Sequence, residues 1–180
     1  MSKIESGKMS LSEEVIHLDR LVGEVAQIIR PEAENRKQKY EAQIRGLEHG
    51  TVCGDAVRIK QILINLLSNA IKYTPVGGRI GLSLDEKLSS ESGVGCFEFT
   101  VEDNGIGMAP EFIDRLFMPF ERAEDPRVSR IQGTGLGLAI TRNLVSMMNG
   151  TIQVDSRMDV GTKFVVTIYL KLAGDGETLR

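Results

Sequence analysis

The hydrophobic positions of the chain follow two periods. Apolar residues recur every three to four residues from Asp19 toward Lys37, over residues 58–73 and from Leu136 to Met148, and this spacing predicts three helices. A shorter amphipathic helix is predicted from Pro110 to Phe117, because proline suits the first turn of a helix.

The residues next to these helices supply the expected start and stop signals. Asp19 and Asp55 are the predicted N-caps of the first two helices, and Pro75 ends the second. Pro31 is expected to kink the first helix. Asn149 with Gly150 suits the left-handed C-cap of the last helix.

Strict alternation of apolar and polar residues predicts strands elsewhere. These strands fall at residues 40–44, 80–84, 97–101, 152–154 and 164–170. The second and third are expected to form a hairpin with a long loop, and the last two turn around Gly161. The predicted fold class is therefore α+β: a two-layer α/β sandwich with a mixed, mostly antiparallel sheet and helices on one face.

A length of 180 residues suits one domain, which we place at residues 13–173. Residues 1–12 carry few apolar side chains and are interpreted as a linker or as the end of a neighbouring element. Residues 174–180 are interpreted as a tail. Residues 121–132 are polar and show no periodicity, so a mobile loop is expected there.

Composition excludes several classes of protein. The net charge is −3, and no run of Lys or Arg exceeds two, which argues against a nucleic-acid partner. Cys53 and Cys96 lack the spacing of a zinc site or a disulfide framework, which favours a reducing cytoplasm. No apolar stretch is long enough to cross a membrane, so we expect no membrane contact by this segment, although a longer parent protein can be membrane-anchored.

Three polar residues share one stripe of the second helix. Asn65, Asn69 and Lys72 point the same way, away from the centre of the apolar face. Two amides and an ammonium group could offer oxygen to a hard cation and positive charge to a phosphate. A solvated helix face is the alternative interpretation.

An acidic residue ends the strand at 97–101 and leads into two spaced glycines. Asp103 can accept a hydrogen bond from an exocyclic amine such as that of adenine, and Gly105 and Gly107 let the backbone approach a flat ligand. The alternative interpretation is an Asp-Asn-Gly turn.

A second glycine-rich segment, residues 133–138 (GTGLGL), opens the last helix. Amide groups at a helix start can bind phosphate. The segment is neither a P-loop nor a dinucleotide fingerprint, because no Lys-Ser/Thr follows and Leu138 stands in place of the third glycine.

Together these motifs resemble the N, first glycine, F and second glycine boxes of sensor histidine kinases. They are residues 65–73 (NLLSNAIKY), 103–107 (DNGIG), 117–120 (FMPF) and 133–138 (GTGLGL). The resemblance extends from Asp19 to Leu172. That family shares the Bergerat-type ATP-binding fold with type II topoisomerases, heat-shock chaperones and mismatch-repair ATPases.

The resemblance implies a complete site for ATP and Mg²⁺. Asp103 would receive the adenine amine, and Asn69 with Asn65 would hold Mg²⁺. Lys72 and the amides at the start of the last helix would meet the phosphates. The nucleotide-binding set that it implies is Asn69, Tyr73, Asp103, Gly105, Ile106, Gly107, Phe120, Thr134, Gly135, Leu136, Gly137 and Leu138.

The loop at residues 121–132 would be a lid over the nucleotide. It would offer Arg122, Arg127 or Arg130 to the terminal phosphate, and the implied catalytic set comprises Asn65, Lys72, Arg122 and Arg130. Hydrolytic members of the superfamily resemble one another in having a glutamate at the position of Asn65. An amide cannot act as a general base, so transfer to another acceptor is favoured over hydrolysis.

The acceptor in this family is a histidine on a dimerisation helix. His17 and His49 lack the surrounding motif, and residues 1–8 resemble the end of the second dimerisation helix. We therefore expect a protein-histidine kinase domain of a two-component system, cut from a longer homodimeric protein. Its partners would be the missing phosphoacceptor domain and a response regulator. A hydrolytic ATPase or chaperone-like module and a degenerate interaction module are the alternatives.

Overall fold

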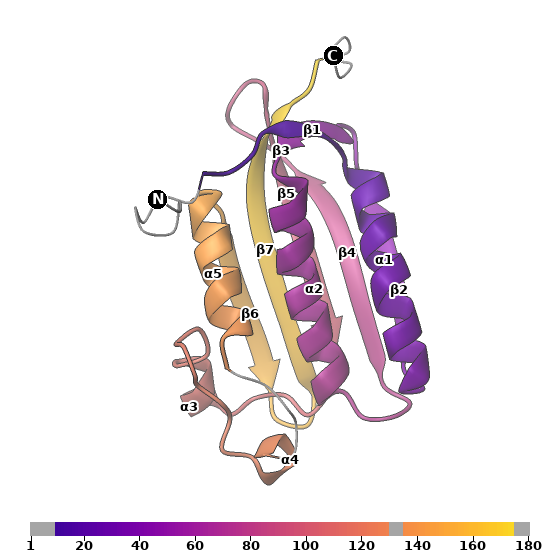
Figure 1. Ribbon diagram of the computed structural model, residues 1–180, viewed down its shortest axis with the longest axis vertical. Helices are drawn as coiled ribbons and strands as arrows, with labels where there is room; N and C mark the ends of the chain where they lie inside the picture. Colours follow the sequence, from indigo (N-terminus) through magenta and orange to yellow (C-terminus); the bar gives the residue numbers. More distant parts are fainter. Residues whose placement is uncertain (1–9, 130–134, 175–180) are drawn as a thin grey trace, which may run out of the picture.

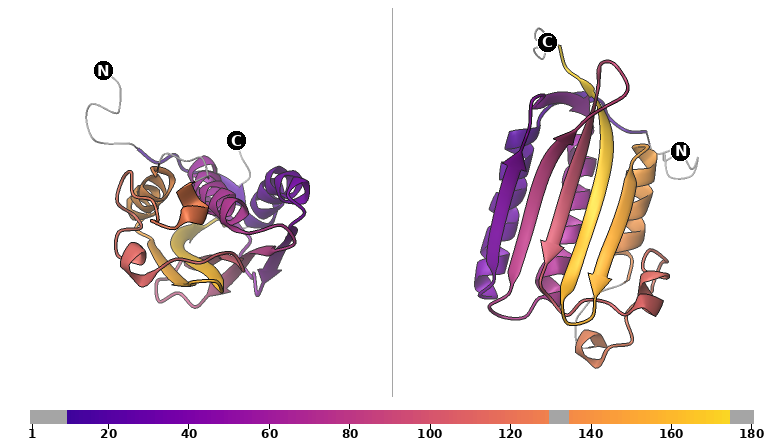
Figure 2. Two further views of the ribbon diagram at one scale, coloured as in Figure 1. Left: turned by 90° about the horizontal axis from the view of Figure 1, so that it is seen from below. Right: turned by 180° about the vertical axis from the view of Figure 1, so that it is seen from behind.

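The computed structural model describes residues 10–129 and 135–174, which form two layers (Figure 1). A seven-stranded sheet is one layer, and α1, α2 and α5 lie side by side on one of its faces (Figure 2). The elements in chain order are β1 (Glu14–His17), α1 (Leu18–Asn35), β2 (Lys39–Arg45), β3 (Thr51–Gly54), α2 (Ala56–Tyr73), β4 (Arg79–Lys87), β5 (Val94–Asp103), α3 (Pro110–Ile113), α4 (Pro126–Ser129), α5 (Gly137–Met147), β6 (Thr151–Arg157) and β7 (Gly161–Leu172).

The sheet is mixed and mostly antiparallel. Its order is β1-β3-β7-β5-β4-β2. Strand β3 pairs with residues 171–172 of β7, and β6 pairs with residues 161–167 of the same strand. Within the described residues, β2 and β4 form the single parallel pair, while β4 with β5 and β6 with β7 form the predicted hairpins. The predicted fold class is confirmed.

Helix α2 supplies much of the core. Its N-cap, Asp55, accepts a hydrogen bond from the amide of Arg58 (3.2 Å), as predicted. Its buried face packs over the central strands β4 and β5. That face consists of Ile59, Ile62, Leu63, Leu66, Leu67, Ala70 and Ile71. Each large aliphatic side chain buried in this way contributes about 1.5–3 kcal/mol.

The structure corrects several predicted boundaries. The N-cap of α1 is His17, which makes no side-chain capping bond, and Asp19 lies inside the first turn. The helix continues through Pro31 to Asn35. The strands β1 and β3 were not predicted; they pair with each other, and a main-chain bond from Leu18 to Gly50 (2.8 Å) continues their contact.

Two further corrections concern the region before the last helix. The predicted helix from Pro110 ends at Ile113 as α3, because only turns follow it. The predicted loop contains a helical turn, α4, which starts at Pro126. At the other end of α5, Asn149 adopts the predicted left-handed conformation (φ 55°).

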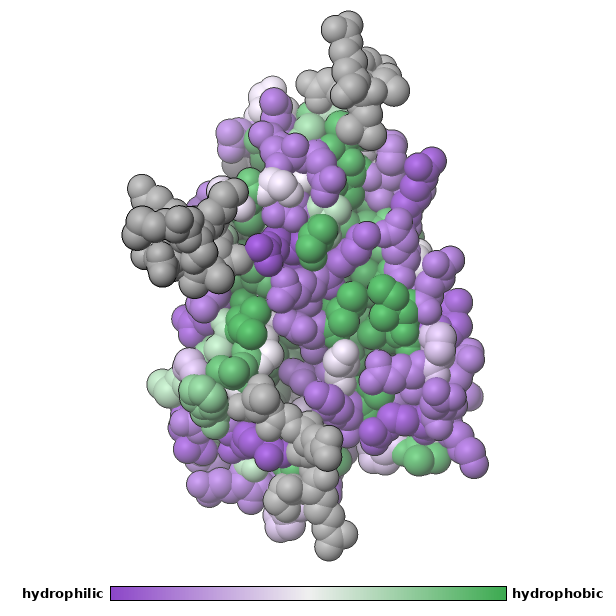
Figure 3. All heavy atoms as spheres, in the orientation of Figure 1, coloured by the Kyte–Doolittle hydropathy of each residue, from purple (hydrophilic) through white to green (hydrophobic). Residues whose placement is uncertain are grey.

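The face that carries the helices is mainly hydrophilic, with scattered apolar areas (Figure 3). Scattered exposed apolar side chains are normal for a folded domain. Within residues 10–129 and 135–174, no helix combines the length and hydrophobicity needed to cross a bilayer. The predicted start of the domain at residue 13 and the predicted tail at residues 174–180 stay predictions.

The core role of α2 can be tested with two alanine variants of the same helix. Leu67 is fully buried, so Leu67→Ala should lower the free energy of unfolding by about 2–5 kcal/mol. Val57 is 65% exposed, and Val57→Ala should change the free energy of unfolding by less than about 0.5 kcal/mol. Urea denaturation measures both, and equal effects would contradict the described packing.

Candidate functional site

A cavity of about 220 Å³ lies between α2, α5 and the end of β5. Its walls come from segments far apart in the sequence, and they include all three predicted polar motifs. The residues that line it are Asn65, Ser68, Asn69, Ala70, Lys72, Tyr73, Asp103, Ile106, Gly107, Met108, Phe112, Leu116, Glu121, Arg122, Ala123, Val128, Gly135, Gly137, Leu138, Thr162 and Phe164.

The polar stripe of α2 faces this cavity. Asn65, Asn69 and Lys72 are half-buried there, because the opposite side of the helix is held on the sheet. The amide nitrogen of Asn65 donates to the hydroxyl of Thr141 on α5 (3.4 Å), and that hydroxyl donates to the carbonyl of Gly137 (2.8 Å). These bonds tie α2 to the first turn of α5, and among the described residues no hydrogen bond engages the amide oxygen of Asn65.

Asp103 lies at the bottom of the cavity, at the end of β5. It pairs with Ile80 of β4 and Thr162 of β7, and its Oδ1 accepts a hydrogen bond from the amide of Gly105 (2.8 Å). Burial raises the pKa of this carboxyl from 3.8 to about 6, although hydrogen bonds from Gly105, Thr162 and Thr74 oppose the rise. A half-buried acceptor with a raised pKa is typical of a functional group.

The Thr74 hydroxyl beside this carboxyl is buried. It has no partner within strict hydrogen-bond geometry among the described residues, but it is close enough to Asp103 to lower that pKa. Thr74 is 1% exposed and does not line the cavity, so its hydroxyl supports the Asp103 carboxyl from behind.

The loop after Asp103 is held between α2 and the turn that joins β6 to β7. The amide of Ile106 donates to the carbonyl of Tyr73 (3.1 Å), and the amide of Asp159 donates to the carbonyl of Ile106 (2.7 Å). Gly107 has φ 67°, and a Cβ there would lie 1.9 Å from the carbonyl oxygen of Arg157. We call residues 105–108 the base loop; its shape requires glycine at 107.

The two ends of the predicted lid are joined. The amide of Phe120 donates to the carbonyl of Gly135 (3.0 Å), and a Cβ on Gly135 would lie 2.8 Å from the Cα of Phe120. The side chain of Phe120, which was predicted to bind the nucleotide, is 73% exposed and does not line the cavity. Residues 121–129 are called the lid segment below.

The first turn of α5 borders the cavity. Gly135, Gly137 and Leu138 line it, whereas Leu136 is the N-cap and does not. In the described part of the chain, no side chain caps this helix, so its first amides are oriented for an anion. Gly105 does not line the cavity either, but its amide donates a hydrogen bond to Asp103. Thr134 and Arg130 fall outside the described residues.

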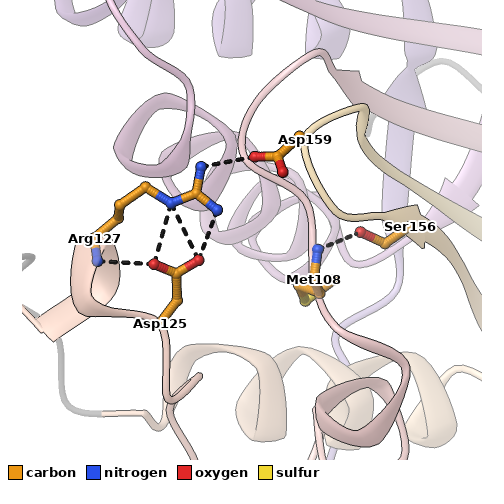
Figure 4. A network of polar contacts seen from close by, with 5 residues as sticks. All are labelled: Met108, Asp125, Arg127, Ser156 and Asp159. Carbon is orange, nitrogen blue, oxygen red and sulfur yellow. Dashed lines mark hydrogen bonds and ion pairs between the residues drawn. The ribbon is translucent and has the colours of Figure 1, made fainter.

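The lid segment contributes one arginine to the cavity. Arg122 lines it, and its Nη2 donates to the carbonyl of Val128 (2.9 Å). Burial raises the pKa of Tyr73, while the nearby Arg122 opposes that rise. Arg127 does not line the cavity; it forms ion pairs with Asp125 (2.7 Å) and Asp159 (2.8 Å) (Figure 4).

Several lining residues were not predicted. They are Ser68, Ala70, Met108, Phe112, Leu116, Glu121, Ala123, Val128, Thr162 and Phe164. Phe164 begins a predicted strand, and Thr162 precedes it; the structure extends this strand back to Gly161, so that Thr162 pairs with Asp103 in the sheet. The alternation of apolar and polar residues predicts the strand. The register that brings Thr162 beside Asp103 depends on pairing between residues that are 59 positions apart in the sequence.

A larger hollow of about 520 Å³ lies at the ends of the same strands on their other side. It is open to solvent and is bordered by side chains of both charges, such as Lys39, Glu41, Arg79 and Lys163. It shares Asp103 and Thr162 with the cavity but none of the α2 residues. The cavity of about 220 Å³ is the better candidate, because the amides, the ammonium group and the helix start converge only there among the described residues.

Comparisons with known proteins identify a matching family and several similar proteins. The family described as "Histidine kinase-, DNA gyrase B-, and HSP90-like ATPase" matches residues 54–173. The autoinducer 2 sensor kinase/phosphatase LuxQ of Vibrio harveyi is 35% identical over 171 residues, which are 94% of this chain and 20% of that protein. The chain therefore spans about a fifth of the length of such curated relatives.

Two solved structures are similar over most of the chain. Full-length ShkA in complex with AMPPNP has a TM-score of 0.75 and 28% identity, with 92% of this chain and 33% of ShkA covered. The nucleotide-free catalytic domain of histidine kinase ThkA has a TM-score of 0.72 and 26% identity, with 91% and 99% covered.

The close approach at the base loop can be tested by adding one methyl group. Gly107→Ala should lower the free energy of unfolding by more than about 1 kcal/mol, because the backbone is left-handed and the new Cβ meets Arg157. Gly23→Ala in α1 is the control: its Cβ meets nothing within 4 Å, and it should stabilise the helix by about 0.5–1 kcal/mol. Urea denaturation decides, and a neutral Gly107→Ala would contradict the described contact.

Proposed function

Since the chain belongs to the histidine kinase-, DNA gyrase B- and HSP90-like ATPases, we propose that it is the domain of a sensor histidine kinase that binds Mg-ATP and donates the γ-phosphate. The observation that carries this proposal is the cavity. It combines Asp103, the polar stripe of α2 and the start of α5 around one space.

The adenine is recognised at the floor of the cavity. Asp103 accepts a hydrogen bond from the exocyclic amine. Burial raises the pKa of the free carboxyl to about 6, and the bound amine opposes this rise because a hydrogen-bond donor stabilises the ionised form. Gly105, Ile106 and Gly107 shape the space for the base, and Tyr73 packs beside it. The apolar side chains of Met108 and Leu116 exclude water from the base.

Mg²⁺ is held by amide oxygens rather than by carboxylates. Within the described residues, no group of three or more His, Cys, Asp or Glu side chains forms a metal cluster. Asn69 and Asn65 face the cavity, and the nitrogen of Asn65 is already engaged with Thr141, so its oxygen fits a hard cation. When bound, the cation neutralises phosphate charge.

The phosphates extend from the enclosed space toward the start of α5. The cavity volume of about 220 Å³ is below the roughly 300–1,000 Å³ of ligand pockets, so the described residues enclose the nucleotide only in part. Lys72 and the amides of Gly135, Leu136 and Gly137 meet the phosphates. From the described part of the lid, Arg122 meets the terminal one; its position in the lining of the cavity supports this role.

Asn65 decides between transfer and hydrolysis. An amide cannot take a proton from water, so this position supplies no general base. Catalysis then comes from alignment and charge neutralisation, with the γ-phosphate presented to a histidine on the dimerisation domain of the parent protein. That phosphoacceptor domain, its homodimeric state and a downstream response regulator are part of the proposal.

The role of Asp103 predicts both an affinity and a pH dependence. At pH 7.5, Asp103→Asn should weaken binding of a non-hydrolysable ATP analogue by about 10- to 150-fold, the range for a hydrogen bond to a charged group. Binding requires the carboxylate. The affinity of the unaltered chain should therefore fall as the pH drops through about 6, more steeply than that of the variant.

Calorimetry at pH 5.5 and 7.5 measures this difference, and titration of the nucleotide itself affects both proteins alike. The variant should stay folded: a raised pKa means that ionised Asp103 costs stability above pH 6, and asparagine removes that cost. An unchanged affinity in a folded Asp103→Asn variant would disprove the adenine assignment.

The kinase reaction can be tested by adding a phosphoacceptor domain. The chain, mixed with a dimerisation domain that carries its histidine and with radiolabelled ATP, should give an acid-labile phosphoprotein. The same domain with its histidine replaced by glutamine should remain unlabelled. Rapid phosphate release without labelled protein would instead support a hydrolytic ATPase.

A further inference from the structure

One ion pair joins the lid segment to the sheet. Nη1 of Arg127, in α4, lies 2.8 Å from Oδ1 of Asp159, in the turn between β6 and β7 (Figure 4). The guanidinium is oriented for this contact by Asp125, whose carboxylate it meets through both Nε and Nη2. Asp125 also accepts the backbone amide of Arg127 (2.8 Å). Asp125 therefore holds the guanidinium of Arg127 in the orientation that the ion pair with Asp159 requires.

The same turn and the end of β6 also hold the base loop. The amide of Asp159 donates to the carbonyl of Ile106, and the hydroxyl of Ser156 accepts the amide of Met108 (3.0 Å) (Figure 4). Asp159 thus makes two contacts of different kinds: its backbone binds the base loop, and its side chain binds the lid segment.

We propose that Asp159 is a positioning residue for nucleotide binding, which sets the lid segment relative to the base loop through its ion pair with Arg127. The functional part of this inference rests on the proposed nucleotide binding. The structural part does not, because both contacts join residues of the chain itself. Arg127, which the sequence suggested for the terminal phosphate, acts instead as the lid's anchor.

The conformation of Asp159 makes a clean test possible. Its φ of 60° is left-handed, and asparagine tolerates that conformation as well as aspartate does. Asp159→Asn therefore removes the charge and keeps the backbone bond to Ile106. Asp155→Asn is the matched control, because Asp155 is exposed on β6 of the same hairpin and forms no ion pair with a described residue.

Hydrogen exchange of the ligand-free chain reports the contact directly. In Asp159→Asn, peptides from residues 121–129 should exchange about two- to fivefold faster, the range expected for an exposed ion pair. Asp155→Asn should match the unaltered chain. Arg127→Gln should exchange faster as well, and adding Asp159→Asn to it should change nothing further, because both remove the same pair. Exchange in Asp159→Asn equal to that of Asp155→Asn would overturn the proposal.

Binding measurements separate positioning from general support of the turn. Asp159→Asn should weaken binding of a non-hydrolysable ATP analogue by about two- to fivefold and leave adenosine binding unchanged, because the base loop keeps its backbone contact. An equal loss for both ligands would contradict the proposed role. If the unaltered chain bound neither ligand, the proposed function would fail, and hydrogen exchange would still show whether Asp159 anchors the lid segment.

Discussion

The packing of α2 on the two central strands is the interaction on which the rest of the structure depends. Because one side of the helix is buried without exception from Ile59 to Ile71, its rotation about its own axis is fixed. Asn65, Asn69 and Lys72 then have one direction in which to point. The hydrophobic effect, which has no directional preference itself, here orients the groups whose direction matters most.

Periodicity was informative where an element is long and has one buried face. The sequence alone predicted α2, α5 and the two hairpins for this reason. The strands β1 and β3 are four residues each, only two periods of alternation, and they exist because they pair with each other and because β3 also pairs with β7.

The candidate site likewise contains residues that local sequence patterns predict and residues that they do not. Asn65, Asn69, Lys72 and Asp103 belong to local motifs and could be predicted, and the structure brings them to one cavity. The contribution of Thr162 depends on strand register, and the outward position of Phe120 depends on a left-handed residue that nothing in FMPF signals. Contacts between distant segments set both positions, so local sequence patterns do not contain them.

The bond between Phe120 and Gly135 has a consequence for how such domains diverge. It brings the two ends of the intervening segment together, close to the start of α5. Each doubling of the length of a closed loop costs only about 0.6 kcal/mol. Insertions and deletions between these residues should therefore be tolerated during evolution, so that related kinases can acquire different rates of nucleotide exchange while the sheet and α2 remain unchanged.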